Sequence, residues 1–125
     1  MNYTAQSECT FNETLEKLQN EAAENGFRVL HVHNVQQTLA DKGFNIGKFS
    51  IVEVCNAKFA YKLLTKEIEY GTMLPCKINI YEDKGKVWIS TPLPTDMVER
   101  FEMAGAKEVA AEVEIILKKV IDSAI

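Results

Sequence analysis

The hydrophobic residues of this chain follow two different periods in turn, and this alternation restricts the possible folds more than any other feature. A period of two is typical of strands, and a period near 3.6 is typical of helices. The strand-like segments are 3–9, 27–33, 49–55, 76–82 and 86–91, and the helix-like segments are 11–24, 35–42, 57–68, 95–103 and 107–123. Only Asp83-Lys84-Gly85 separates the last two strands, which predicts a β-hairpin. We therefore expect an α+β fold with helices packed on a mainly antiparallel sheet.

Residues with known capping chemistry mark several helix boundaries. Thr10 and Glu13 have the spacing of a capping box, in which each side chain satisfies a free amide at the start of a helix. Asn25-Gly26 suits a left-handed helix end, and Asn34 and Asn56 suit N-caps. These local signals predict helices that begin at residues 11, 35 and 57.

The strand over 27–33 contains both histidines of the chain. Strict alternation places Phe27, Val29, His31 and His33 on one face of the sheet, and Leu30 and Val32 on the other. His31 and His33 could then bind a metal, with Cys55 or Cys76 as a further donor. We favour a half-exposed polar patch instead, because two histidines alone do not complete a metal site.

Composition indicates one globular domain over residues 1–125. Hydrophobic residues make up 46% and charged residues 26% of the chain, which is the usual globular range. The net charge of −4 provides no basic field, so we expect no nucleic-acid partner and no anionic membrane surface as a partner. No stretch approaches the roughly 18 apolar residues that span a bilayer, and the N-terminus lacks a signal-peptide pattern.

The three cysteines are Cys9, Cys55 and Cys76. Their odd number and wide spacing argue against a disulfide framework and favour reduced thiols in a cytoplasm. Cys55 precedes the helix that starts at Ala57, where a thiol can gain reactivity. Alternatively, Cys55 and Cys76 are small buried hydrophobic residues, and this is the interpretation that we favour.

The chain lacks the common catalytic and cofactor patterns. It has no phosphate-binding loop, no Gly-x-Gly-x-x-Gly, no Gly-x-Ser-x-Gly and no Cys-x-x-Cys. These absences favour a binding protein over an enzyme without deciding between them, and the residues alone name no cofactor.

The chain resembles the domain-of-unknown-function 302 family. The resemblance covers almost the whole chain, from about Thr10 to the last helix. The positions that fit the family pattern in order are Gly26-Phe27, Cys55-Asn56, Ala60, Leu74-Pro75-Cys76 and Tyr81-Glu82. One position departs from the pattern, because Ala57 stands where the family has a proline after Cys-Asn. Proline is favoured in the first helical turn, so this change relaxes the local backbone without removing chemistry.

The resemblance implies a fold similar to the TATA-binding-protein-like arrangement, a β-α-β(4)-α sandwich, and association into homodimers. It implies no nucleic-acid role, since a fold does not carry a function with it. The Cys-Asn and Leu-Pro-Cys segments are the most distinctive parts of the pattern. We therefore expect a site for a small ligand, with an anionic group such as a carboxylate or phosphate as one candidate, near the helix start at Ala57. The expected site residues are Cys55, Asn56, Ala57, Leu74, Pro75, Cys76 and Tyr81.

Two alternatives to a ligand-binding domain stay open. One is a thiol, sulfur-transfer or redox protein that uses Cys55 or Cys76, and the other is a structural or assembly subunit without a ligand. If Cys55 and Cys76 line one pocket, we expect them to lie close together without forming a bond, because a cytoplasm keeps thiols reduced. Alternatively, the two thiols are buried in separate parts of the core. Trp88, Phe101 and Met103 are the large apolar residues that are hardest to place in the core of one subunit.

Overall fold

Five antiparallel strands form one sheet in the computed structural model, which describes residues 1–125. The strands are β1 (Asn2–Ser7), β2 (Arg28–Asn34), β3 (Phe49–Cys55), β4 (Cys76–Asp83) and β5 (Lys86–Pro92), in the spatial order β1-β5-β4-β3-β2. The helices are α1 (Phe11–Glu24), α2 (Val35–Ala40), α3 (Ala57–Lys66), α4 (Pro94–Arg100) and α5 (Lys107–Ala124), with short 3-10 helices η1 (Ile68–Met73) and η2 (Ala104–Ala106). The predicted α+β fold is confirmed. Its main elements follow the β-α-β(4)-α order, with α2, α3 and α4 inserted between or after the strands.

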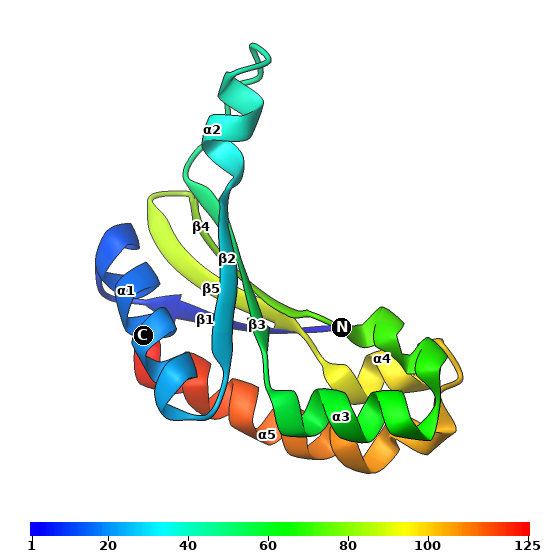
Figure 1. The fold of residues 1–125 in the computed structure, drawn as a ribbon. Helices are drawn as coiled ribbons and strands as arrows, with labels where there is room; N and C mark the ends of the chain where they lie inside the picture. Colours follow the sequence, from blue (N-terminus) through cyan, green and yellow to red (C-terminus); the bar gives the residue numbers. More distant parts are fainter.

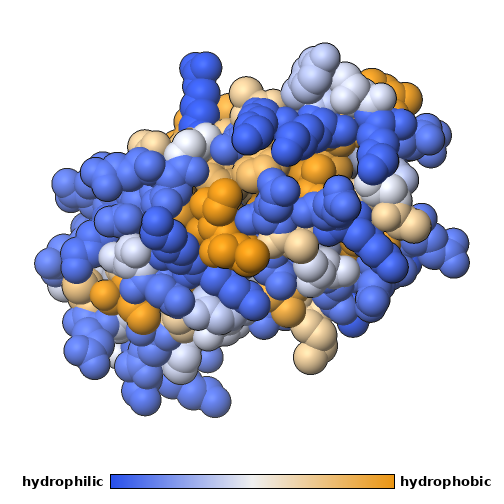
Figure 2. All heavy atoms as spheres, turned by 90° about the horizontal axis from the view of Figure 1, so that it is seen from below, coloured by the Kyte–Doolittle hydropathy of each residue, from blue (hydrophilic) through white to orange (hydrophobic).

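Helices α1 and α5 cover one face of the sheet (Figure 1). The side chains that β3, β4 and β5 direct toward these helices are fully buried: Val52, Val54, Ile78, Ile80 and Ile89. They meet Leu18 of α1 and Leu117, Val120 and Ile121 of α5. Hydrophilic residues cover most of the outside of this helical layer (Figure 2). Because α1 joins β1 at one edge of the sheet to β2 at the other, it passes across the whole sheet and closes the core.

No helix covers the opposite face of the sheet, which we call the open face (Figure 1). Helices α3 and α4 pack beside α5 at one end of the sheet instead of lying over this face. Most side chains of the open face are partly exposed, and they include Phe49 and Tyr81, whose rings stack at 5.5 Å between centroids. None of the helices is long and apolar enough to cross a membrane.

Local capping works as the sequence predicts. Helix α1 spans the expected residues, and its capping box is complete: the Glu13 amide donates to the Thr10 hydroxyl oxygen at 3.2 Å, and the Thr10 amide donates to the Glu13 carboxylate at 3.4 Å. Gly26 follows the helix at φ 83°, a left-handed conformation that favours glycine. The chain can therefore reverse sharply and enter β2.

The expected side-chain arrangement on the β2 strand is wrong. A β-bulge shifts the register between Val29 and His31, so that Val29 pairs with Val54 and Val32 pairs with Val52. Both valines therefore share the helix-covered face, whereas His31 and His33 lie on the open face opposite Glu53 and Ile51. The extra residue in the bulge breaks the strict alternation from which the prediction was made.

Residues 35–48, which we call the arm, extend beyond the body of the protein (Figure 1). The arm comprises α2 and the loop that leads to β3, and it continues the β2 and β3 strands away from the sheet. Asn34 caps α2 by accepting a hydrogen bond from the Gln37 amide at 3.0 Å. Two large apolar side chains of the arm are left exposed, Phe44 at 65% and Ile46 at 42%. The fold of one subunit therefore does not use them.

Candidate functional site

A cavity of about 330 Å³ lies at the end of the sheet where β3 leads into α3 and where the chain enters β4 and leaves β5. Its walls come from these strand ends and from α3, η1, α4 and α5. Phe59 and Leu63 of α3 and Val109, Val113 and Leu117 of α5 supply much of the apolar surface. The cavity continues the hydrophobic core between the sheet and the helices.

The cavity lining is mostly apolar. Eleven of the nineteen lining residues are hydrophobic, and three more are Pro75, Pro92 and Pro94, which are all the prolines of the chain. A proline has no backbone N–H, so these three positions offer a ligand no amide donor. The remaining lining residues are Glu53, Asn56, Thr72, Lys77 and Thr91.

Asn56 lines the cavity and also connects two segments that are distant in the sequence. Its side-chain oxygen accepts a hydrogen bond from the Phe59 amide at 3.2 Å, which caps α3. Its side-chain nitrogen donates to the Gly26 carbonyl at 3.0 Å. The amide group thus holds the start of α3 against the turn between α1 and β2, and its oxygen and one of its two N–H groups are engaged within the protein.

Leu74, Pro75 and Cys76 line the cavity where the chain enters β4. Burial, and then the nearby Cys55 thiol, raise the pKa of Cys76 to about 11. At neutral pH the Cys76 side chain is therefore a protonated thiol, which contributes an apolar surface and a weak donor.

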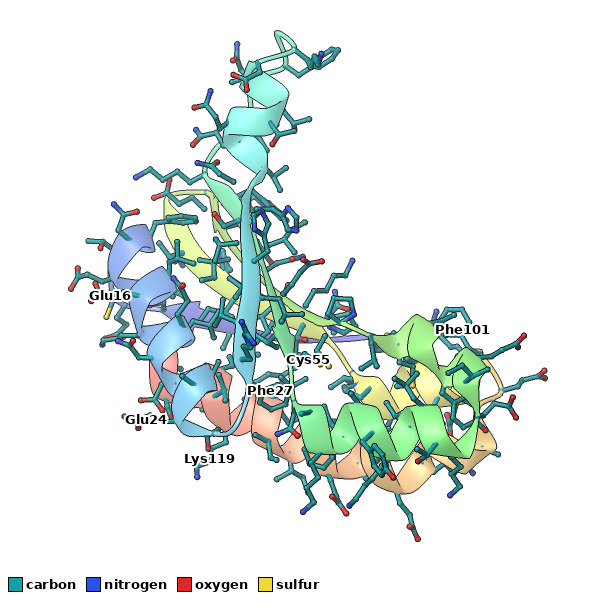
Figure 3. All side chains as sticks on the ribbon, viewed as in Figure 1. Glu16, Glu24, Phe27, Cys55, Phe101 and Lys119 are labelled. Carbon is teal, nitrogen blue, oxygen red and sulfur yellow. The ribbon has the colours of Figure 1, made fainter.

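Cys55 lies beside Cys76 in the sheet but is not part of the cavity wall. Cys76 pairs with Val54, the residue before Cys55, so the Cα atoms of the two cysteines are within about 9 Å of each other. Because successive residues point to opposite faces, Cys55 lies on the open face whereas Cys76 lies toward the cavity. Both thiols are free. Figure 3 shows Cys55 at the end of β3, close to Phe27, which also lines the cavity.

Two other expected site residues lie away from the cavity. Ala57 is exposed in the first turn of α3 and faces outward. Tyr81 lies farther along β4, where it stacks on Phe49 on the open face. The structure thus brings together Asn56, Leu74, Pro75 and Cys76, and separates them from Cys55, Ala57 and Tyr81.

The two histidines form a pair on the open face. Their ring centroids are 4.3 Å apart in an edge-to-face arrangement, and His33 Nε2 lies 3.1 Å from the Glu53 carboxylate. The structure contains no group of three or more His, Cys, Asp or Glu side chains placed to bind a metal. Cys55 and Cys76 do not complete a ligand set with these imidazoles.

Most of the cavity wall carries no signal of its own in the sequence. The period of the last helix, 107–123, predicts buried positions for Val109 and Val113, and this period cannot distinguish a packed position from one beside a cavity. Met73 and Met97 carried no signal of their own. The three prolines were the one available hint, because they flank the start of β4 and the end of β5, which lie at the same end of this hairpin.

Comparison with known proteins places this geometry in a family. The family model named "Domain of unknown function DUF302" matches residues 3–124. A solved structure described as an uncharacterized conserved DUF302 protein from Bacillus stearothermophilus superposes with a TM-score of 0.94 at 33% sequence identity, covering 99% of this chain and 98% of that one. No curated protein matches the chain. The Asn56 and Leu74-Pro75-Cys76 segments that line the cavity are the same segments on which the resemblance to the family rested, and the chain belongs to the DUF302 family.

Proposed function

We propose that this protein is a small-molecule binding domain and that the cavity between the sheet end and helices α3, α4 and α5 is its ligand site. The observation that carries the proposal is the cavity itself, which has a volume of about 330 Å³ and an apolar wall. Ligand sites are concave and mostly apolar, with volumes of roughly 300–1,000 Å³. The volume here suits a ligand at the small end of that range.

The construction of the wall supports this proposal. A well-packed core leaves few voids larger than a water molecule, because each void costs contacts that its lining atoms could make. Asn56 and the Leu74-Pro75-Cys76 segment are held in place by a helix cap and by strand pairing, so the cavity has a defined shape without a ligand.

A thiol-based activity has less support at Cys76. A nucleophilic thiol needs a lowered pKa and access to its substrate. Burial raises the pKa of Cys76 to about 11, which keeps it protonated at neutral pH. Its neighbour Cys55 lies on the other face of the sheet, so the two thiols do not face one substrate.

The test is thermal unfolding of the protein with a panel of small aromatic and aliphatic alcohols, amides, carboxylates and amines. Ala110 is buried on α5 and lines the cavity, whereas its neighbour Ala111 is exposed. We expect at least one compound to raise the unfolding midpoint of the wild type and of Ala111→Leu, but not of Ala110→Leu, in which the added side chain occupies the cavity. Met97→Phe blocks the cavity from α4 and serves as a second blocked variant if Ala110→Leu does not fold.

Two outcomes would overturn the proposal. In one, no compound stabilises the wild type, which would favour a structural or assembly role. In the other, a compound stabilises the wild type, the blocked variant and Ala111→Leu equally, which would place binding outside the cavity.

We also propose that two copies of the chain associate. The arm leaves Phe44 and Ile46 exposed, and the open face leaves half-exposed aromatic rings on one side of the sheet. Asn79 lies near the middle of β4, the central strand, and its buried side-chain oxygen has no hydrogen-bond partner. A second copy that packs on the open face would supply apolar contacts for the rings and a donor for this oxygen.

A further inference from the structure

We propose, building on the function proposed for the cavity, that its ligand is an uncharged and mainly apolar molecule. Three features of the cavity decide between an anion, a cation and a neutral compound. They are the direction of the charged side chains of the lining residues, the hydrogen bonds that the polar lining residues already make, and the position of the α3 N-terminus.

No charged side chain of the lining residues points into the cavity. Glu53 and Lys77 are the only charged residues of the lining, and they are direct cross-strand partners in β3 and β4. They alternate with Val54 and Cys76, so their side chains lie on the open face, where the Glu53 carboxylate is 3.1 Å from His33 Nε2. An ion inside the cavity would therefore gain no nearby countercharge to offset the loss of its water, and desolvation of an ion is costly.

The uncharged polar residues of the lining have little capacity left for a ligand. Thr91 donates its hydroxyl to the Lys77 carbonyl at 2.9 Å, and Thr72 donates to the Glu69 carbonyl at 3.2 Å. Asn56 uses its oxygen for the Phe59 amide and one of its two N–H groups for the Gly26 carbonyl. Among these side chains a carboxylate or phosphate would therefore find at most one free N–H, whereas such groups need several donors when they are buried.

The start of α3 does not provide an anion site here. Its side-chain cap is Asn56, and Ala57 is exposed and lies outside the lining. What the cavity offers is a polarisable apolar surface, because the sulfur-containing Met73, Met97 and Cys76 lie in the same wall as Phe27 and Phe59. Thioether sulfur and aromatic rings make favourable contacts with other rings, so a neutral aromatic compound suits this surface.

The test uses three probes of matched shape and different charge: benzyl alcohol, benzoate and benzylamine. Binding is followed in the full chain by NMR of the methionine methyl groups, of which Met73 and Met97 line the cavity and Met1 is 74% exposed. We expect benzyl alcohol to shift the Met73 and Met97 signals saturably, with the Met1 signal unchanged. Its Kd should be at least about tenfold lower than that of either ion at pH 7.

Variants separate this inference from the function on which it rests. Ala110→Leu should abolish the shifts and Ala111→Leu should preserve them. In Lys77→Gln the Kd of benzyl alcohol should stay within about twofold, because a neutral ligand does not use the ammonium group. An ion that binds as tightly as the alcohol would overturn the inference and leave the cavity as a ligand site. If none of the three probes moves the Met73 and Met97 signals, both the inference and the cavity function fail.

Discussion

Asn56 shows how one side chain can connect two parts of this fold. Its cap on Phe59 is local, whereas its bond to the Gly26 carbonyl crosses 30 positions of sequence. The contact is close, since a Cβ placed on Gly26 would lie 3.1 Å from the Asn56 side-chain nitrogen. The cap was predictable from the residue type ahead of a helical pattern. The bond to Gly26 was not, because no local pattern records which turn lies beside that cap.

We predict that Asn56→Ala lowers the free energy of unfolding by about 2 kcal/mol, because it removes a helix cap and a second hydrogen bond. Asn34→Ala is the matched control, since Asn34 caps α2 through the Gln37 amide and its side chain makes no bond to a distant segment. It should cost about 1 kcal/mol or less. Urea denaturation measures both. Equal losses in the two variants would mean that the bond to Gly26 contributes no stability.

At the scale of elements, a partly buried contact joins α4 to α5. The Thr95 hydroxyl and amide donate to the Glu114 carboxylate at 2.7 and 3.1 Å, and the Lys118 ammonium lies 3.6 Å from it. Burial raises the pKa of Glu114, but the Thr95 hydrogen bonds and the Lys118 charge outweigh it, so that the pKa lies below its ordinary value of 4.5. The ionised carboxylate therefore stabilises the position of α4 beside the cavity.

The lowered pKa of Glu114 makes the free energy of unfolding depend on pH. A carboxyl group whose folded pKa is lowered contributes stability above its unfolded pKa and loses that contribution as the pH falls through the folded value. We predict that Thr95→Val lowers the free energy of unfolding by about 1 kcal/mol at pH 7 and that this loss shrinks as the pH falls below 4.5. Denaturant unfolding between pH 2 and 7 measures it.

Thr65→Val is the control for this pH dependence. The Thr65 hydroxyl donates to the Tyr61 carbonyl at 2.7 Å and has no carboxylate partner. The loss of unfolding free energy in Thr65→Val should be independent of pH over the same range. A Thr95→Val effect that is equally independent of pH would show that Glu114 ionisation does not depend on the Thr95 hydroxyl.

At the scale of the whole molecule, the arm and the open face are the parts that one subunit does not complete. Of the apolar residues that were hardest to place from the sequence, Met103 packs against the core, Trp88 is partly buried on the open face and Phe101 is 62% exposed. The prediction of a homodimer therefore rests on the arm and the open face, with Phe44 and Ile46 as the exposed large apolar residues of the arm.

We predict that the protein sediments as a dimer at ~50 µM, a concentration above the dissociation constant of most stable dimers. Phe44→Ser with Ile46→Ser should shift it to monomer without unfolding the body, since neither side chain is buried in one subunit. Ile115→Ser is the control, because Ile115 is 70% exposed on α5, on the helical side of the molecule. A wild type that is monomeric at this concentration, or an arm variant that remains dimeric, would contradict the proposed interface.

The order and type of the elements were available from the sequence alone. Hydrophobic periods, the Thr10–Glu13 capping box, the Asn56 cap and the Asp83–Gly85 turn all act over a few residues. The interactions that decide such features connect neighbours in the chain, so a linear pattern contains them. The resemblance to the DUF302 family then supplied the β-α-β(4)-α arrangement, and it marked Asn56 and the Leu74-Pro75-Cys76 segment.

The bulge in β2, the two faces of the sheet and the cavity were decided only by the tertiary structure. The bulge moved Val29 away from the histidines because Val52 and Val54, more than 20 positions later, set the pairing register. The cavity draws its wall from residues between Phe27 and Leu117. The packing of the layers in three dimensions decides whether those side chains fill the space between the strand ends and the helices. The hydrophobic period of a single segment is the same whether that space is filled or empty.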